Sequence, residues 1–170
     1  MQYQTSTNGS LTHTQKLTIS GMVMALYIVI VGATQGISFG AYQIRIATSL
    51  YALGWLYPFL VIPLGLANML SNVLFGGLGP LDMIGGGLVG VATTFLITVI
   101  RKKKGNVWLA ALPIFLIPGL VVPIWLSVLL NIPYPPLAFS VSVGQIIPAI
   151  CGVFLIRILS RIVSRKEILV

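Results

Sequence analysis

Charged residues are scarce in this sequence. They make up 7 % of its 170 residues, and hydrophobic residues make up 57 %. A soluble domain carries about a quarter charged residues. With a mean hydropathy of +1.03, this chain cannot dissolve as a compact globule, so we expect an integral membrane protein. Its length suits one membrane domain and is too short for an added soluble catalytic domain.

Acids, histidine and cysteine are scarcer still. The only acidic residues are Asp82 and Glu167, the only histidine is His13 and the only cysteine is Cys151. An intrachain disulfide is therefore excluded, and metal sites or paired catalytic carboxylates lack the necessary residues. A serine nucleophile would have no base to activate it. We expect no catalytic residues, no metal ligands and no enzyme activity.

The sequence also lacks a phosphate-binding loop. No glycine-rich run ends in Gly-Lys-Ser or Gly-Lys-Thr, so the chain cannot hold ATP in that way. Intramembrane acids of the kind that relay protons are missing as well. Any energy that the protein uses must therefore come from a partner or from a gradient.

Basic residues are present, in a restricted pattern. The net charge is +8, and nine of the ten Lys and Arg residues are Lys16 or lie in 101–104 and 157–166. Basic loops are retained on the cytoplasmic side of a membrane. The pattern therefore indicates a lipid bilayer as the partner, and no nucleic acid.

An even number of membrane crossings must separate Lys16 from the cluster 101–104 if both are cytoplasmic. The apolar block 47–75 is too long for one helix across a hydrocarbon core of about 30 Å, and Pro58 interrupts it. Divided there, it provides two short helices that are buried against their neighbours. Six helices are predicted, at about 17–34, 47–57, 59–75, 81–100, 107–130 and 137–162.

The predicted fold is therefore all-α, an integral membrane protein with six transmembrane helices and both termini cytoplasmic. The chain divides into a polar cytoplasmic segment 1–16, a single membrane domain 17–163 and a basic cytoplasmic tail 164–170. The glycine-rich run 76–80 is predicted to be a loop on the outer side. The glycines of 85–90 are predicted to lie on faces that pack closely against other helices.

Polar residues gather in the outer half of this topology, around the loop that holds Arg45. Amide groups in apolar surroundings cost several kcal/mol unless they find partners, so they should meet one another or a ligand. Flat amide and aromatic groups suit a planar heterocycle. The candidate substrate-binding residues are Gln43, Arg45, Asn68, Asn72, Asp82, Trp125, Tyr134 and Gln145.

Simpler structural explanations remain open for most of these residues. Asp82 could cap its helix or pair with Arg45, and Arg45 could extend to the lipid headgroups. Asn68 and Asn72 could only join neighbouring helices. The two aromatic residues could belong to the belt at the membrane interface.

The run 37–46 (ISFGAYQIRI) is unusual, and it is followed by the Asn68 region, by 76–82 (GGLGPLD) and by 141–145 (VSVGQ). Together these segments resemble the queuosine-precursor transporter family over roughly residues 17–160. Those proteins are substrate-binding S components of energy-coupling factor (ECF) vitamin transporters. The resemblance implies a prokaryotic plasma-membrane protein that captures a small, vitamin-like planar heterocycle, such as a 7-deazaguanine queuosine precursor, at its outer face.

The resemblance also implies partners. Gly21 and Ala25, one turn apart on the first helix, would dock on a transmembrane coupling protein. Two ATPases would use ATP, and no cofactor is expected in this chain itself. The alternative is a stand-alone small-molecule permease, or a membrane assembly subunit with no ATPase partner.

The sequence departs from the family pattern at two acids. Ala47-Thr48 stands where the family has Ser-Glu, and Gly144-Gln145 stands where it has Gly-Glu. If those acids meet a cationic group on the ligand, this chain should prefer a neutral or anionic ligand, such as a nitrile-bearing 7-deazaguanine.

Overall fold

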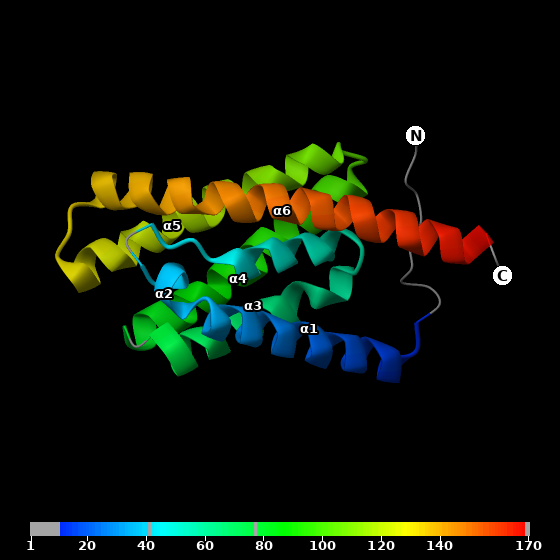
Figure 1. Ribbon diagram of the computed structural model, residues 1–170, viewed down its shortest axis with the longest axis horizontal. Helices are drawn as coiled ribbons and strands as arrows, with labels where there is room; N and C mark the ends of the chain where they lie inside the picture. The colour runs from blue at the N-terminus through cyan, green and yellow to red at the C-terminus, as the bar shows by residue number, and fades with distance from the viewer. Residues whose placement is uncertain (1–10, 41, 77, 169–170) are drawn as a thin grey trace.

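The computed structural model describes residues 11–40, 42–76 and 78–168, with side chains as far as residue 163. Within these ranges the fold is entirely helical and contains no strand, which confirms the predicted class (Figure 1). The elements in chain order are α1 (His13–Ala33), α2 (Gln35–Ser38), η2 (Ile46–Trp55), η3 (Pro58–Leu60), α3 (Val61–Ser71), η4 (Asn72–Gly76), α4 (Pro80–Lys102), η5 (Val107–Ala110), α5 (Ala111–Leu130) and α6 (Tyr134–Ile168).

Five segments of the described chain are long and apolar enough to cross a membrane. They are His13–Ala33, Pro58–Gly76, Pro80–Lys102, Val107–Leu130 and Tyr134–Val163. The protein is therefore a multi-pass membrane protein. The segment 47–57, predicted to be a further crossing, is not among them.

This segment is η2, a 3₁₀ helix of ten residues. It runs through the bundle from the end where α1 finishes to the end where α4 finishes (Figure 1). At a rise of about 2.0 Å per residue it extends about 20 Å, less than a hydrocarbon core of about 30 Å. Residues 47–55 are all buried, so η2 packs against helices and not against lipid. At its end, Thr98 Oγ1 donates a hydrogen bond of 3.1 Å to the Gly54 carbonyl.

Two helices begin earlier than predicted, for local reasons. The Thr12 hydroxyl accepts from the Gln15 backbone while the Gln15 side chain accepts from the Thr12 backbone, and this capping box starts α1 at His13. Pro135 and Pro136 fall in the first turn of α6, where the helix needs no backbone N–H donors. Residues 1–10 and 169–170 of the two predicted terminal segments lie outside the described residues.

Glycines bring α3 and α4 into close contact, as predicted for the glycine-rich part of α4. A Cβ added to Gly90 would lie 2.9 Å from Gly65 Cα, and one added to Gly65 would lie 2.9 Å from the Gly87 carbonyl oxygen. Larger residues would separate the two helices. Their close approach places the polar end of α3 against the first turns of α4.

The basic residues gather at one end of the bundle. The beginning of α1, the end of α4 and the end of α6 all lie at the same end (Figure 1). The Arg101 guanidinium at that end donates to the carbonyl of Leu56, just beyond η2 (3.4 Å). The beginning of α4 and the end of α5 lie at the opposite end, and the polar residues described next are nearer to it.

Candidate ligand-binding site

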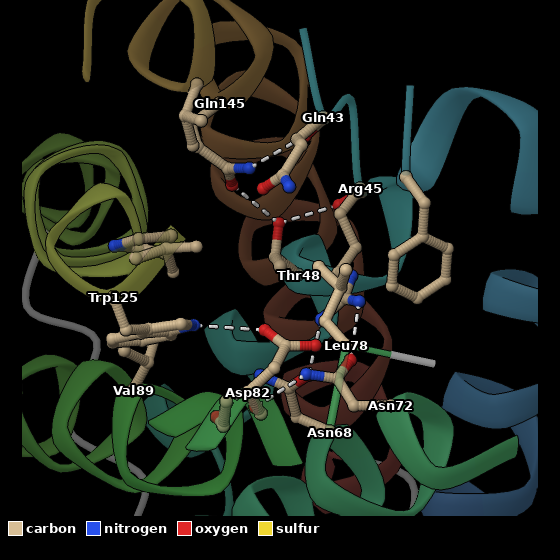
Figure 2. Close-up of a pocket in the computed structure, with 15 residues that line it drawn as sticks. Gln43, Arg45, Thr48, Asn68, Asn72, Leu78, Asp82, Val89, Trp125 and Gln145 are labelled. Atoms are coloured by element: carbon tan, nitrogen blue, oxygen red, sulfur yellow. Dashed lines mark hydrogen bonds between the residues drawn. The ribbon is translucent and has the colours of Figure 1, made fainter. Parts of the chain in front are cut away.

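A small cavity lies among η2, α3, α4, α5 and α6, beneath the loop segment 42–45. Its volume is about 30 Å³, room for about two water molecules. Seven of the eight predicted site residues line it: Gln43, Arg45, Asn68, Asn72, Asp82, Trp125 and Gln145. Their amide, guanidinium and carboxylate groups face one another across the cavity (Figure 2).

Arg45 is held in place by two asparagines and an aromatic ring. Its Nη1 donates to Asn68 Oδ1 at 2.5 Å and its Nη2 donates to Asn72 Oδ1 at 2.6 Å. Its Cζ lies 4.7 Å from the centre of the Phe39 ring, a distance typical of a cation–π contact. The guanidinium therefore points into the protein. It neither reaches the headgroups nor forms an ion pair with Asp82, the two alternatives open from the sequence.

Asn68 is a positioning residue. Its Nδ2 donates to Tyr51 Oη at 2.8 Å and to the Gly86 carbonyl at 2.6 Å, so both amide hydrogens are used. Behind it, Tyr51 Oη is hydrogen-bonded to Tyr27 Oη at 3.0 Å. Asn68 thus joins helices, as the structural alternative supposed, and its remaining oxygen fixes Arg45.

Asn72 connects Arg45 to the start of α4. Its Nδ2 donates to the backbone carbonyl of Asp82 at 2.9 Å. A Cβ on Gly86 would lie 2.5 Å from this nitrogen, so the hydrogen bond depends on a glycine at that position. The network aligns the guanidinium of Arg45 with the first turn of α4.

Asp82 lies in that first turn and is 6 % exposed. One carboxylate oxygen, Oδ1, accepts a hydrogen bond of 3.0 Å from Trp125 Nε1. The other, Oδ2, has no hydrogen-bond partner among the described residues. The positive end of the helix dipole favours a carboxylate here. Asp82 therefore occupies the helix-start position that the structural alternative gave it and also lines the cavity.

A neutral group of side chains forms the opposite wall. Thr48 Oγ1 lies 3.0 Å from Gln145 Oε1 and 2.7 Å from the Arg45 carbonyl, and can donate to either. Gln145 Nε2 donates to the Gln43 carbonyl at 3.2 Å. The side-chain amide of Gln43 has no hydrogen-bond partner among the described residues. Thr48 and Gln145 are thus in direct contact.

The loop lies directly on Gly144 of α6. A Cβ added to Gly144 would lie 1.8 Å from the Tyr42 carbonyl oxygen and 3.2 Å from Gln43 C. Gln43 has a φ of 43°, a left-handed conformation that is uncommon outside glycine, asparagine and aspartate. The close contact with Gly144 and the left-handed conformation of Gln43 place the loop over the cavity.

Tyr134 is the predicted site residue that the structure does not bring to the cavity. It is 37 % exposed at the start of α6, and its hydroxyl donates to the Leu120 carbonyl at 2.9 Å. The prediction rested on its position beside the turn between α5 and α6. That turn extends beyond the level of the cavity, so proximity in sequence was misleading.

Sequence reasoning missed several residues of the lining. Phe39 and Thr48 could have been included, because Phe39 precedes Arg45 in the unusual run 37–46 and Thr48 follows Arg45 at the start of η2. The apolar wall could not, since its residues look like any lipid-facing residue of these helices. It comprises Leu78, Val89, Pro118, Val122 and Val141.

The site has the character of a binding site for a polar ligand. Its lining carries one cation, one anion and several amides on one side of an apolar wall. The described residues contain no group of three or more His, Cys, Asp or Glu that could hold a metal ion. Its groups can donate and accept hydrogen bonds in a small cavity among apolar helices.

The model of the QueT transporter family matches residues 17–161. The chain belongs to the QueT transporter family. The match confirms the resemblance seen in the sequence, and it spans every residue that lines the cavity. Comparisons with curated proteins and with solved structures found no match. This QueT transporter family member is thus a multi-pass membrane protein with a polar cavity near one end of its bundle.

Proposed function

We propose that this protein is the substrate-binding S component of an ECF-type importer and captures a 7-deazaguanine queuosine precursor at the outer face of a prokaryotic plasma membrane. A coupling protein and two ATPases would then use ATP to move the ligand inward. The observation that carries the proposal is the preorganised polar cavity of a transporter-family chain. The guanidinium of Arg45 and the unpaired Asp82 oxygen offer hydrogen bonds to a flat, polar ligand.

The cavity must enlarge to accept such a ligand. A volume of about 30 Å³ is far smaller than the several hundred Å³ of typical ligand pockets. The segment 42–45 is the part of the wall that can move with least cost, because it lies outside the helices. The ligand would enter as the loop lifts from Gly144 and would be enclosed as the loop returns.

The neutral wall sets the expected charge of the ligand. Thr48 and Gln145 are in contact and carry no charge, so a cationic amine beside them would lose its water without gaining a counter-ion. In isothermal titration of the purified protein, we expect a nitrile-bearing 7-deazaguanine to bind more tightly than an amine-bearing one. Gln145→Glu is expected to reverse this preference, because it supplies the missing counter-ion.

Tighter binding of the amine by the unmodified protein would refute the proposed ligand charge. Thermal unfolding of both proteins provides the control, since Gln145→Glu also changes the hydrogen bond to the Gln43 carbonyl.

The outward face of α1 is the proposed docking surface for the coupling protein. α1 is the least buried of the five long helices, with 11 % of its most apolar stretch inside the molecule. A Cβ on Gly21 would have no atom within 4 Å, so space there is open to another helix. Gly21 and Ala25 are small enough for a close helix–helix approach.

The double substitution Gly21→Leu, Ala25→Leu is expected to abolish co-purification with the coupling protein and the ATPases. The two side chains would hold the partner helix away, while binding of the heterocycle, on the other side of α1, should be unchanged. Val128→Leu serves as the control, because Val128 is 71 % exposed on α5, away from this surface. Undiminished co-purification of the double variant would show that the partner docks elsewhere.

A further inference from the structure

The carboxylate of Asp82 has one occupied oxygen and one free oxygen. Oδ1 accepts from Trp125 Nε1, while Oδ2 has no hydrogen-bond partner among the described residues. The residue is 6 % exposed, and its carboxylate lies in the cavity wall (Figure 2). Because it faces the cavity, this free carboxylate oxygen can accept a hydrogen bond from a bound ligand.

Trp125 fixes the orientation of this carboxylate. A Cβ on Gly85 would lie 2.9 Å from Trp125 Cζ2, so the indole lies flat against α4 and is not free to turn. The hydrogen bond from Nε1 then holds one oxygen toward α5. The free oxygen is left on the side of the cavity that also holds Arg45.

Asp82 and Arg45 form a matched acceptor and donor. Asn72 links them, accepting from Arg45 Nη2 and donating to the Asp82 backbone carbonyl. The guanidinium has five N–H donors, of which the asparagines take two. Arg45 therefore retains donors, and Asp82 retains an acceptor, in the wall of the same cavity.

We infer that Asp82 is the residue that recognises a ring N–H and an adjacent exocyclic amino group of the ligand, while Arg45 donates to the neighbouring carbonyl. This inference rests on the proposed function. A 2-amino-4-oxo-pyrimidine ring presents this order of groups along one edge: amino, ring N–H, carbonyl. A carboxylate can accept the first two, and hydrogen bonds to a charged acceptor are stronger than neutral ones.

This arrangement divides the ligand between the two walls. The pyrimidine edge faces Asp82 and Arg45, and a substituent on the five-membered ring faces Thr48 and Gln145. The charge preference at the neutral wall and the edge recognition at Asp82 are then separate properties. A ligand that lacks the amino group gives up one of its two hydrogen bonds to this charged acceptor, so it should bind less tightly.

Isothermal titration with matched ligand pairs tests this inference. The first pair is 7-deazaguanine and 7-deazahypoxanthine, which differ only in the exocyclic amino group. The second pair, pterin and 4-hydroxypteridine, makes the same change on another ring system. We expect the protein to bind 7-deazaguanine at least about tenfold more tightly than 7-deazahypoxanthine, a difference of about 1.4 kcal/mol.

Asp82→Asn should remove this preference, leaving the two members of a pair within about twofold of each other. The amide can retain an acceptor for Trp125, but its NH₂ group opposes the donors of the ligand. Glu167→Gln is the matched control, because it neutralises the only other acidic residue of the chain and should leave the preference unchanged. The comparison of ligands in the unmodified protein needs no substitution, so it holds even if Asp82→Asn does not fold.

The outcomes separate this inference from the proposed function. Equal binding of the two 7-deazapurines would support the proposed function and overturn the role of Asp82, as would a preference that persists in Asp82→Asn. If neither 7-deazapurine binds and pterin binds more tightly than 4-hydroxypteridine, the role of Asp82 is supported and the 7-deazaguanine ligand is contradicted. Failure of all four compounds to bind would overturn both.

Discussion

Arg45→Ala is expected to weaken ligand binding by at least about tenfold, or about 1.4 kcal/mol. The substitution removes the only cation of the cavity lining. It also leaves the side-chain oxygens of Asn68 and Asn72 without their donor, although these residues are only 2 % and 3 % exposed. Each unpaired buried group costs about 1–3 kcal/mol, so the midpoint of thermal unfolding should fall as well. Titration of the folded variant with 7-deazaguanine measures the first effect.

Arg45→Lys is the matched control for charge. Lysine restores a cation, but it lacks the planar fork with which Arg45 spans both asparagines. The ligand affinity of Arg45→Lys should lie between that of Arg45→Ala and that of the unmodified protein. If both variants bind the ligand as tightly as the unmodified protein, Arg45 has no part in recognition and only supports the fold.

Gly144→Ala, which adds a single methyl group, is expected to weaken ligand binding at least as much as Arg45→Ala. The new Cβ would lie 1.8 Å from the Tyr42 carbonyl oxygen and 2.9 Å from Tyr42 C, and both are backbone atoms that no rotamer change can move away. The segment 42–45 must lift from α6, breaking the hydrogen bond from Gln145 to the Gln43 carbonyl. With the cover displaced, the ligand should dissociate faster and its affinity should fall at least about tenfold.

Gly36→Ala provides the control for this substitution, because a Cβ there would have no atom within 4 Å. It makes the same chemical change just before the loop and should leave affinity and dissociation rate unaltered. Ligand dissociation from Gly144→Ala at the unmodified rate would mean that the loop does not cover the ligand.

The convergence of polar residues could be predicted from the sequence because its cause is energetic. Asn68, Asn72 and Gln145 stand in apolar helices, where an unpaired amide is costly. A membrane chain with so few polar groups has few ways to pair them. The composition alone therefore predicts that these residues gather around Arg45. Which atoms form the hydrogen bonds depends on the close approach of α3 and α4.

The form of η2 could not be predicted in the same way. Counting crossings indicated a segment at 47–57 that returns through the bundle, and the structure contains one. Residues 47–55 are all buried, and hydrophobic periodicity cannot distinguish a 3₁₀ helix from an α-helix in a uniformly apolar run. Six membrane crossings remain a prediction, since only five segments of the described chain are long enough to span a bilayer.

The depth of a side chain along the helix bundle is poorly predicted from the sequence. Tyr134 was assigned to the site from its place in a turn, yet it bonds to Leu120 outside the cavity. Trp125, on α5 before that turn, does reach the cavity and bonds to Asp82. Because a helix rises about 1.5 Å per residue, an error of a few residues in depth separates a wall residue from a surface residue.

Mass spectrometry of the small molecules retained by the purified protein tests the proposed function most directly. The protein is isolated from cells grown with 7-deazaguanine queuosine precursors. The bound compounds are released by denaturation, and the amount of each is compared with the amount of protein. We predict a 7-deazaguanine in near-stoichiometric amount with the unmodified protein, and less than about a tenth of that amount with Arg45→Ala. Retention of an unrelated compound, or of equal amounts by both proteins, would contradict the assignment of this cavity as the queuosine-precursor site.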